Sequence, residues 1–112
     1  MDNCLFCKII KREKHSKIDF ESDEVLAFED ISPQAPVHIL IIPKIHINSP
    51  GEVTSENSRL AGLLTEAAAG IAKDLKLSDY RLVMNCGEDA GQSVFHLHMH
   101  LLAGRKMNWP PG

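Results

Sequence analysis

The sequence predicts an α+β domain in which an antiparallel sheet packs against one long helix. Short apolar or alternating runs, each bounded by turn residues, are typical of strands. They cover Val25–Glu29, 37–42, 80–85 and 94–102. Between the second and third of these runs, apolar residues recur at spacings of three and four, as on one face of a helix. Strands on both sides of a single long helix favour an antiparallel sheet.

The first elements have clear boundaries in the sequence. A mixed apolar and basic start predicts a short helix near residues 6–11, and the strand over Val25–Glu29 ends at Asp30 and a Ser-Pro turn. Residues 37–42 are almost entirely apolar and mostly β-branched. We therefore expect a strand that is buried on both faces and stopped by Pro43.

The long helix is expected to start after Thr54 or Ser55, either of which can cap its N-terminus. Its predicted buried stripe comprises Leu60, Leu63, Leu64, Ala67, Ala68, Ile71 and Leu75. The next strand is followed by a polar loop, residues 86–93, in which Gly87 and Gly91 can act as hinges.

Size and composition limit the possible functions. The 112 residues suffice for one domain, so we treat 1–112 as a single unit. A net charge of −3 argues against broad nucleic-acid binding, which needs a basic face. No run approaches the ~18 apolar residues of a membrane span, and the first residues lack a signal-peptide pattern. We expect a cytoplasmic protein without nucleic-acid or membrane partners, whose cysteines are thiols or metal ligands.

The strongest signal is a row of histidines in the last predicted strand. His96, His98 and His100 alternate with apolar residues, so the imidazoles share one face of a strand. The other face comprises Phe95, Leu97, Met99 and Leu101, which we expect to pack under the helix. Packing does not explain the histidine face, because a buried imidazole needs a partner for each ring nitrogen.

Three interpretations of this row are open. The histidines can form a solvated polar face, bind a metal ion, or carry out catalysis with a different role for each ring. Metal binding by all three is strained, because Cα atoms four residues apart on a strand are about 13 Å apart. We favour catalysis, since an ordinary histidine, with a pKa of about 6.5, is mostly neutral at neutral pH and can attack phosphorus. The preceding segment, residues 91–93, adds donors where a phosphate would lie.

Residues 96–102, His-Leu-His-Met-His-Leu-Leu, match the signature of the histidine triad family, in which three histidines alternate with apolar residues. Further matches resemble the Hint branch of that family over nearly the whole chain. They are residues 26–31, 33–36, 42–44, Asn85, 91–93 and parts of 104–112. The resemblance implies a HIT-like α+β fold with an antiparallel sheet of about five strands, one long helix and a short N-terminal helix. It also implies a homodimer whose subunits share a sheet.

The activity implied by the resemblance is hydrolysis of purine nucleoside 5′-phosphoramidates such as adenosine 5′-monophosphoramidate. His98 would attack the α-phosphorus and form a nucleotidyl-histidine intermediate that water then cleaves, while His100 would hydrogen-bond the phosphate. Trp109 would lie near the active site of the partner subunit. The other implied contacts are Gln92 and Ser93 near the phosphate and leaving group, Gly91 in the phosphate loop, Asp30 at the ribose, Phe6, Phe28 and Ile31 around the base, and Asn85 as a further polar contact.

A cysteine pair near the N-terminus has the spacing of two metal ligands or of a redox pair, and no strand precedes it as the redox motif requires. A closed zinc site needs four ligands. The resemblance implies a structural zinc ion, and no catalytic metal, bound by Cys4, Cys7, His46 and His96. That arrangement leaves His98 and His100 for catalysis. We expect His38, which lies in an apolar strand, to be a satisfied core histidine.

Other functions are open at this point. The chain can be a nucleotide-binding regulatory protein whose hydrolysis is incidental, or a hydrolase of dinucleoside polyphosphates. It can also be a zinc-dependent enzyme that binds the metal with the histidine row.

Overall fold

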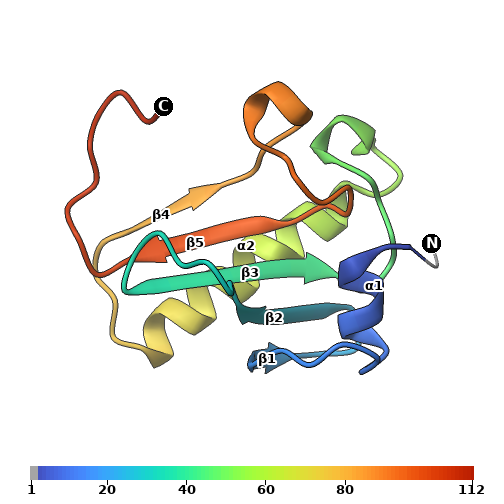
Figure 1. Cartoon of the computed structure of the whole chain (residues 1–112), viewed down its shortest axis with the longest axis horizontal. Helices are drawn as coiled ribbons and strands as arrows, with labels where there is room; N and C mark the ends of the chain where they lie inside the picture. Colours follow the sequence, from blue (N-terminus) through green and yellow to red (C-terminus); the bar gives the residue numbers. More distant parts are fainter. Residues whose placement is uncertain (1–2) are drawn as a thin grey trace.

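The computed structural model describes residues 3–112. Met1 and Asp2, at the start of the segment that lacks a signal-peptide pattern, lie outside the described residues. In this part of the chain the strands are β1 (Ile18–Glu21), β2 (Val25–Glu29), β3 (Val37–Pro43), β4 (Tyr80–Val83) and β5 (Met99–Ala103). The helices are α1 (Leu5–Ile10) and α2 (Ser58–Asp74), with short 3-10 helices η1 (Pro50–Glu52) and η2 (Glu88–Ala90). The strands form one antiparallel sheet in the order β1-β2-β3-β5-β4 (Figure 1).

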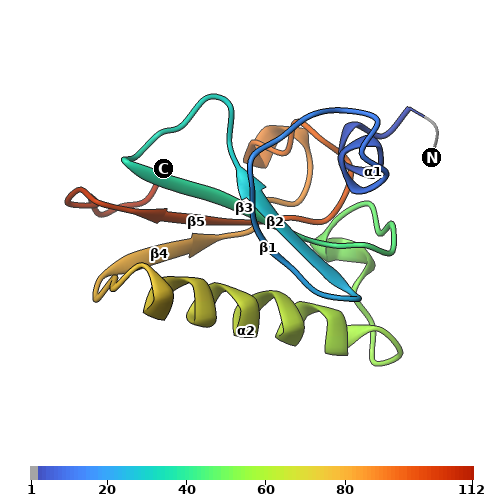
Figure 2. The ribbon, with the colours of Figure 1, turned by 90° about the horizontal axis from the view of Figure 1, so that it is seen from below.

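The two faces of the sheet carry different layers. α2 lies along one face, whereas α1 and the loops that precede β3 and β5 lie on the other (Figure 2). β3 is buried on both, as predicted: Ile39 and Ile41 pack in the core beneath α2, and Leu40 and Ile42 pack with Phe6 on the opposite face. Each fully buried side chain of this kind contributes about 1.5–3 kcal/mol. The second face holds the site described below.

The predicted strand over 94–102 is only partly correct, because β5 begins at Met99. The chain bends over residues 94–96, and the N–H of Leu97 donates to the carbonyl of Ile47 at 2.6 Å, outside any strand ladder. The expected alternation of faces nevertheless holds for the residues that pack in the core beneath α2, namely Leu97, Met99 and Leu101. The expectation that Phe95 is buried with them is wrong, because it is 50% exposed.

Other boundaries also differ from the predictions. α2 begins at Ser58 with Asn57 as its N-cap, because the hydroxyl of Thr54 instead accepts from the N–H of Glu56 in the preceding turn. Leu75 is the C-cap of α2 and is exposed. The strand predicted over 80–85 ends at Val83. Sequence patterning misses β1 because this edge strand is mostly exposed.

No helix within residues 3–112 combines the length and the apolar character needed to cross a membrane.

Candidate active site and metal cluster

A cavity of about 540 Å³ lies on the face of the sheet opposite α2. Its lining includes most of the predicted nucleotide-site residues: Phe6, Phe28, Asp30, Ile31, Gly91, Ser93, His98 and His100. They come from α1, from the end of β2 and the turn that follows it, from the loop over residues 86–93, from the segment that leads into β5 and from β5 itself. A larger cavity, lined by residues 76–81 and 104–107, contains none of them.

Two predicted contact residues do not line this cavity. The side chain of Gln92 is buried, accepts from the N–H of Gly87 at 2.9 Å and donates to the carbonyls of Asn48 at 2.7 Å and Val94 at 3.1 Å. These hydrogen bonds occupy the side-chain amide of Gln92 and hold the loop in place. Asn85 precedes this loop, and its side-chain amide lies beside Gly91. Both residues therefore support the cavity wall.

Gly91 gives the loop its shape at the cavity. Its φ of +101° lies in the left-handed region that favours glycine, and it lines the cavity next to Ser93. A residue without a Cβ allows a bound phosphate to approach the backbone closely.

The orientation of His98 is determined by its hydrogen bond to the backbone. Its Nδ1 lies 2.7 Å from the carbonyl oxygen of His96, which can only accept, so Nδ1 carries the proton. In the neutral ring the lone pair is therefore on Nε2. No hydrogen bond within residues 3–112 involves this nitrogen, and in the same range no buried side-chain N or O atom lacks a partner. Nε2 of His98 must consequently be accessible from the cavity that the residue lines.

His100 has the opposite arrangement of protons. The N–H of Gln34 donates to Nδ1 of His38 at 3.0 Å, so the neutral His38 ring carries its proton on Nε2. That nitrogen lies 2.9 Å from Nδ1 of His100, which must accept. His100 therefore has its own proton on Nε2. With ring centroids 5.0 Å apart, His98 offers a lone pair and His100 offers an N–H donor.

Burial keeps the rings of His100 and His38 neutral. It lowers the pKa of His100 to about 4, with smaller contributions from the neighbouring His98 and His38. It also lowers the pKa of His38, an effect that the carboxylate of Asp30 partly opposes. The 3.4 Å contact between Asp30 and Nε2 of His38 is thus a contact with a neutral ring at neutral pH.

His38 is a residue of the candidate site that the sequence analysis does not predict. It is buried and fully hydrogen-bonded, as a core histidine would be, but one of its partners is His100. The relevant signal lies in the strand pairing: Leu40 pairs with His100 in the β3–β5 register, and His38 is two residues away on the same face. That register is not visible in the sequence.

These pKa values predict how stability depends on pH. Because the pKa of His100 is about 4 in the folded chain and higher in the unfolded chain, the unfolded chain binds more protons between those values, and stability falls as the pH falls through that window. The variant His100→Asn removes this titrating ring, and its amide oxygen can still accept from His38. Between about pH 7 and pH 5 we expect its free energy of unfolding to fall by about 1 kcal/mol less than that of the wild type, after allowance for partial exposure.

Urea unfolding at the two pH values measures this difference. His15→Asn, which removes an exposed histidine, should retain the wild-type response. Equal losses in the wild type and His100→Asn would show that this ring is not held neutral by the fold.

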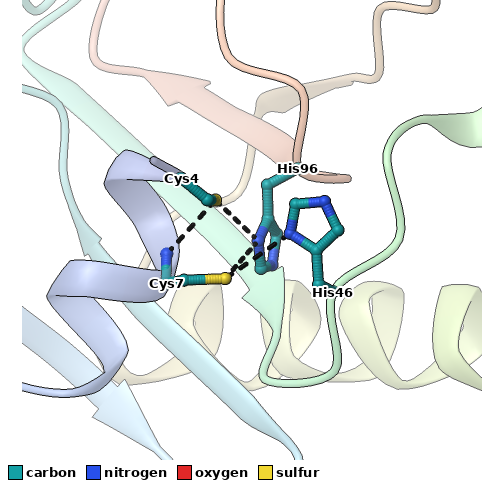
Figure 3. Close-up of side chains that lie close together, drawn as sticks. All are labelled: Cys4, Cys7, His46 and His96. Carbon is teal, nitrogen blue, oxygen red and sulfur yellow. Dashed lines mark hydrogen bonds between the residues drawn. The ribbon is translucent and has the colours of Figure 1, made fainter. Parts of the chain in front are cut away.

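A second group of side chains converges beside the cavity. Cys4 is the N-cap of α1 and Cys7 lies in its first turn, while His46 follows β3 and His96 precedes β5 (Figure 3). Nδ1 of His96 lies 3.3 Å from Sγ of Cys4 and 3.6 Å from Sγ of Cys7, and Nδ1 of His46 lies 3.4 Å from Sγ of Cys7. A tetrahedral zinc ion with ordinary bond lengths places sulfur and nitrogen ligands about 3.6 Å apart.

The protons of this cluster also suit a metal ion. Nε2 of His96 donates to the carbonyl of Pro43 and Nε2 of His46 donates to Oδ1 of Asn48, each at 2.8 Å. Both Nδ1 atoms are then free to act as ligands, and such outer contacts are what orient histidines at metal sites. Burial lowers the pKa of His96 to about 4, so it is neutral as a ligand must be. Burial and the neighbouring Cys4 raise the pKa of the Cys7 thiol, so metal binding would release a proton.

A further group, formed by Asp30, His38 and His100, also has its donor atoms within 4.8 Å of one another. Its protons do not suit a metal ion, because Nε2 of His38 carries the proton that it donates to His100. All three residues line the cavity, where His38 is hydrogen-bonded to His100 and lies 3.4 Å from the carboxylate of Asp30.

Comparison with known proteins agrees with this geometry. The family model of the HIT domain matches residues 11–107. The chain belongs to the HIT family. The match begins after Cys7, so the cysteine pair lies outside the matched residues.

Relatives of this HIT protein include a 14 kDa zinc-binding protein of Zea mays, 50% identical over 111 residues that cover 96% of this chain and 87% of that protein. Adenylylsulfatase HINT1 of Arabidopsis thaliana is 47% identical over 111 residues, covering 96% of this chain and 76% of that protein. A HIT family hydrolase from Legionella pneumophila has the same fold, with a TM-score of 0.95 at 48% identity over 98% of this chain and 100% of that one. The predicted α+β HIT fold is confirmed, and the chain is a nucleotide-binding protein of a hydrolase family.

Proposed function

We propose that this HIT protein hydrolyses purine nucleoside 5′-phosphoramidates through a nucleotide covalently bound to His98. The observation that carries the proposal is where two histidine rings at one cavity carry their protons. Nε2 of His98 has a free lone pair because its Nδ1–H is bonded to the carbonyl of His96, and the neighbouring His100 has an N–H for the phosphate.

The reaction follows from these protonation states. Nε2 of His98 forms a bond to the α-phosphorus as the phosphorus–nitrogen bond to the leaving group breaks. The leaving nitrogen keeps the electron pair and takes up one proton from solvent water, so it departs as a neutral amine. The ring is then positively charged, and the Nδ1–H bond to the carbonyl of His96 stabilises that charge. Water then attacks the phosphorus as the bond from phosphorus to Nε2 breaks. This releases the nucleoside monophosphate, restores the neutral ring and gives one proton back to the solvent. Ser93 would hydrogen-bond the leaving group.

The rest of the cavity suits a nucleoside. The rings of Phe6 and Phe28 meet edge to face with centroids 5.3 Å apart, and Ile31 is 89% exposed, which leaves an apolar surface for a base. Asp30 accepts from the N–H of Ser32 at 2.8 Å with one carboxylate oxygen. We assign the carboxylate of Asp30 to the ribose hydroxyls.

Asp30→Asn tests the ribose assignment. The amide oxygen can still accept from Ser32, but the charged acceptor is lost, so we expect AMP to bind about 10-fold more weakly. The measurement is calorimetric binding of AMP and of its 2′,3′-dideoxy analogue, which has no ribose hydroxyls to lose. A similar weakening for both ligands would contradict the assignment.

We also propose that the cluster of Cys4, Cys7, His46 and His96 binds a structural zinc ion. Bound there, zinc would supply folding energy by joining α1 to the segments around β3 and β5. The donor distances and free Nδ1 atoms described above support this, and a relative carries the name of a zinc-binding protein. No step of the proposed reaction uses the ion.

A homodimer completes the proposal. β4 is an edge strand that pairs only with β5 within the described residues, and Trp109 is 82% exposed in the C-terminal tail. Pairing of this edge with a second copy would extend the sheet, and the tail of one subunit would approach the active site of the other. Sedimentation analysis should then give twice the chain mass of 12.4 kDa. Sedimentation at the mass of a single chain would contradict this part.

Turnover with a panel of substrates tests the activity. We expect adenosine and guanosine phosphoramidates to be hydrolysed with a higher kcat/KM than dinucleoside polyphosphates. Adenylyl sulfate belongs in the panel because it also presents an α-phosphorus to His98, and one relative is named an adenylylsulfatase. Binding of AMP without hydrolysis of any member would instead favour a regulatory nucleotide-binding protein.

A further inference from the structure

The short helix α1 belongs to both the metal cluster and the nucleotide cavity. Cys4 and Cys7 place their sulfurs in the cluster, whereas Phe6, between them, is 4% exposed and lines the cavity with His98. Six residues are far too few for a helix to be stable by itself in water. The position of α1 therefore depends on what its side chains contact.

Phe6 makes the contacts that matter for the cavity. Its ring is edge-on to Phe28, at 5.3 Å between centroids, and to the nucleophilic ring of His98, at 5.1 Å. A displacement of α1 would move this ring away from both the base region and His98.

His96 provides a second connection between the two sites. Its Nδ1 faces the sulfurs of Cys4 and Cys7, while its carbonyl oxygen accepts the Nδ1–H of His98 at 2.7 Å. The side chain is completely buried, and its ring is edge-on to Phe6 at 5.9 Å. Fixing the His96 ring thus constrains the backbone group that orients His98.

We propose that metal binding at the cluster and nucleotide binding at the cavity are positively coupled through α1 and His96. Without an ion, thiol–imidazole hydrogen bonds hold the first turn of α1 to the rest of the chain. Four metal–ligand bonds hold the same groups in the arrangement that the nucleotide also requires. Each ligand then favours the conformation that binds the other, and the effect is reciprocal. The inference rests on the proposed function, because it takes a nucleotide as the ligand of the cavity.

The test uses two equilibrium measurements on the whole protein at one pH. Zn²⁺ affinity is measured by competition with a chromophoric chelator, with and without saturating AMP. AMP affinity is measured by calorimetry, with and without Zn²⁺. We expect both affinities to increase by the same factor, about 10-fold. Amide hydrogen exchange should show that α1 is best protected when both ligands are bound.

Two variants examine the route of the coupling. Phe6→Leu retains all four metal ligands but removes the ring contacts with Phe28 and His98. We therefore expect each ligand to increase the affinity for the other by less than about 3-fold. Cys86→Ser removes an exposed thiol that belongs to neither site, and the full factor should remain.

The outcomes separate the two proposals. If AMP bound equally well with and without Zn²⁺, the ion would be purely structural and the coupling would be refuted, while the proposed function would stand. A full factor in Phe6→Leu would also refute the route through α1. If AMP bound neither form, the proposed function would fail together with the coupling.

Discussion

His98→Asn is expected to lower kcat/KM for adenosine 5′-monophosphoramidate by at least about 10⁴-fold, with AMP affinity changed only a few-fold. The asparagine amide can still donate to the carbonyl of His96, as Nδ1 of His98 does at 2.7 Å, so the local backbone should be retained. What the variant lacks is a nitrogen lone pair that can attack phosphorus. Steady-state hydrolysis and calorimetric AMP binding measure the two quantities.

His15→Asn is the matched control, because it makes the same exchange at an exposed histidine on the rim of the same cavity. Its turnover should stay within a few-fold of the wild type. Turnover of His98→Asn close to that of the wild type would exclude the covalent mechanism, even if the protein bound nucleotides normally.

Zinc is expected to stabilise the fold strongly. At 100 times its dissociation constant, a ligand that binds only the folded chain raises the free energy of unfolding by about 2.7 kcal/mol. For a chain of this size the midpoint of thermal unfolding should rise by roughly 10 °C. Differential scanning calorimetry with Zn²⁺ and with a chelator measures the shift. Hydrolysis should persist in the chelated protein, because no step uses the ion.

The double variant Cys4→Ser/Cys7→Ser should lose this shift. Serine at position 4 can still accept from the N–H at position 7, as the Cys4 sulfur does, so the helix cap is retained while the metal ligands are lost. Cys86→Ser should show the full shift. A shift that persisted in the double variant would place the zinc elsewhere.

The parts of the fold that sequence patterning predicts are those in which burial follows the chain's own periodicity. α2 and β3 are examples, since one buries a stripe and the other is covered on both faces. β1 gives no such signal because it lies at an edge of the sheet. The alternation at His96 and His98 holds without a strand, because an extended segment alternates its faces whether or not it is paired.

The candidate site was predictable where chemistry is concentrated locally and unpredictable where it depends on distant contacts. The histidine row and the cysteine pair are short motifs, and the resemblance supplied His46 as a further ligand. The role of His38 depends on the β3–β5 register. The bonds of the Gln92 amide depend on Asn48, which is distant in sequence, so its use in holding the loop could not be foreseen.

The covalent step is tested most directly by trapping the intermediate. The wild-type protein would be mixed with adenosine 5′-monophosphoramidate, quenched at alkaline pH and analysed by peptide mass spectrometry. We predict one adenylyl group on His98, formed within a single turnover and missing in His98→Asn. Hydrolysis with no adduct, or with the adduct on another residue, would contradict the assignment of His98 as the nucleophile.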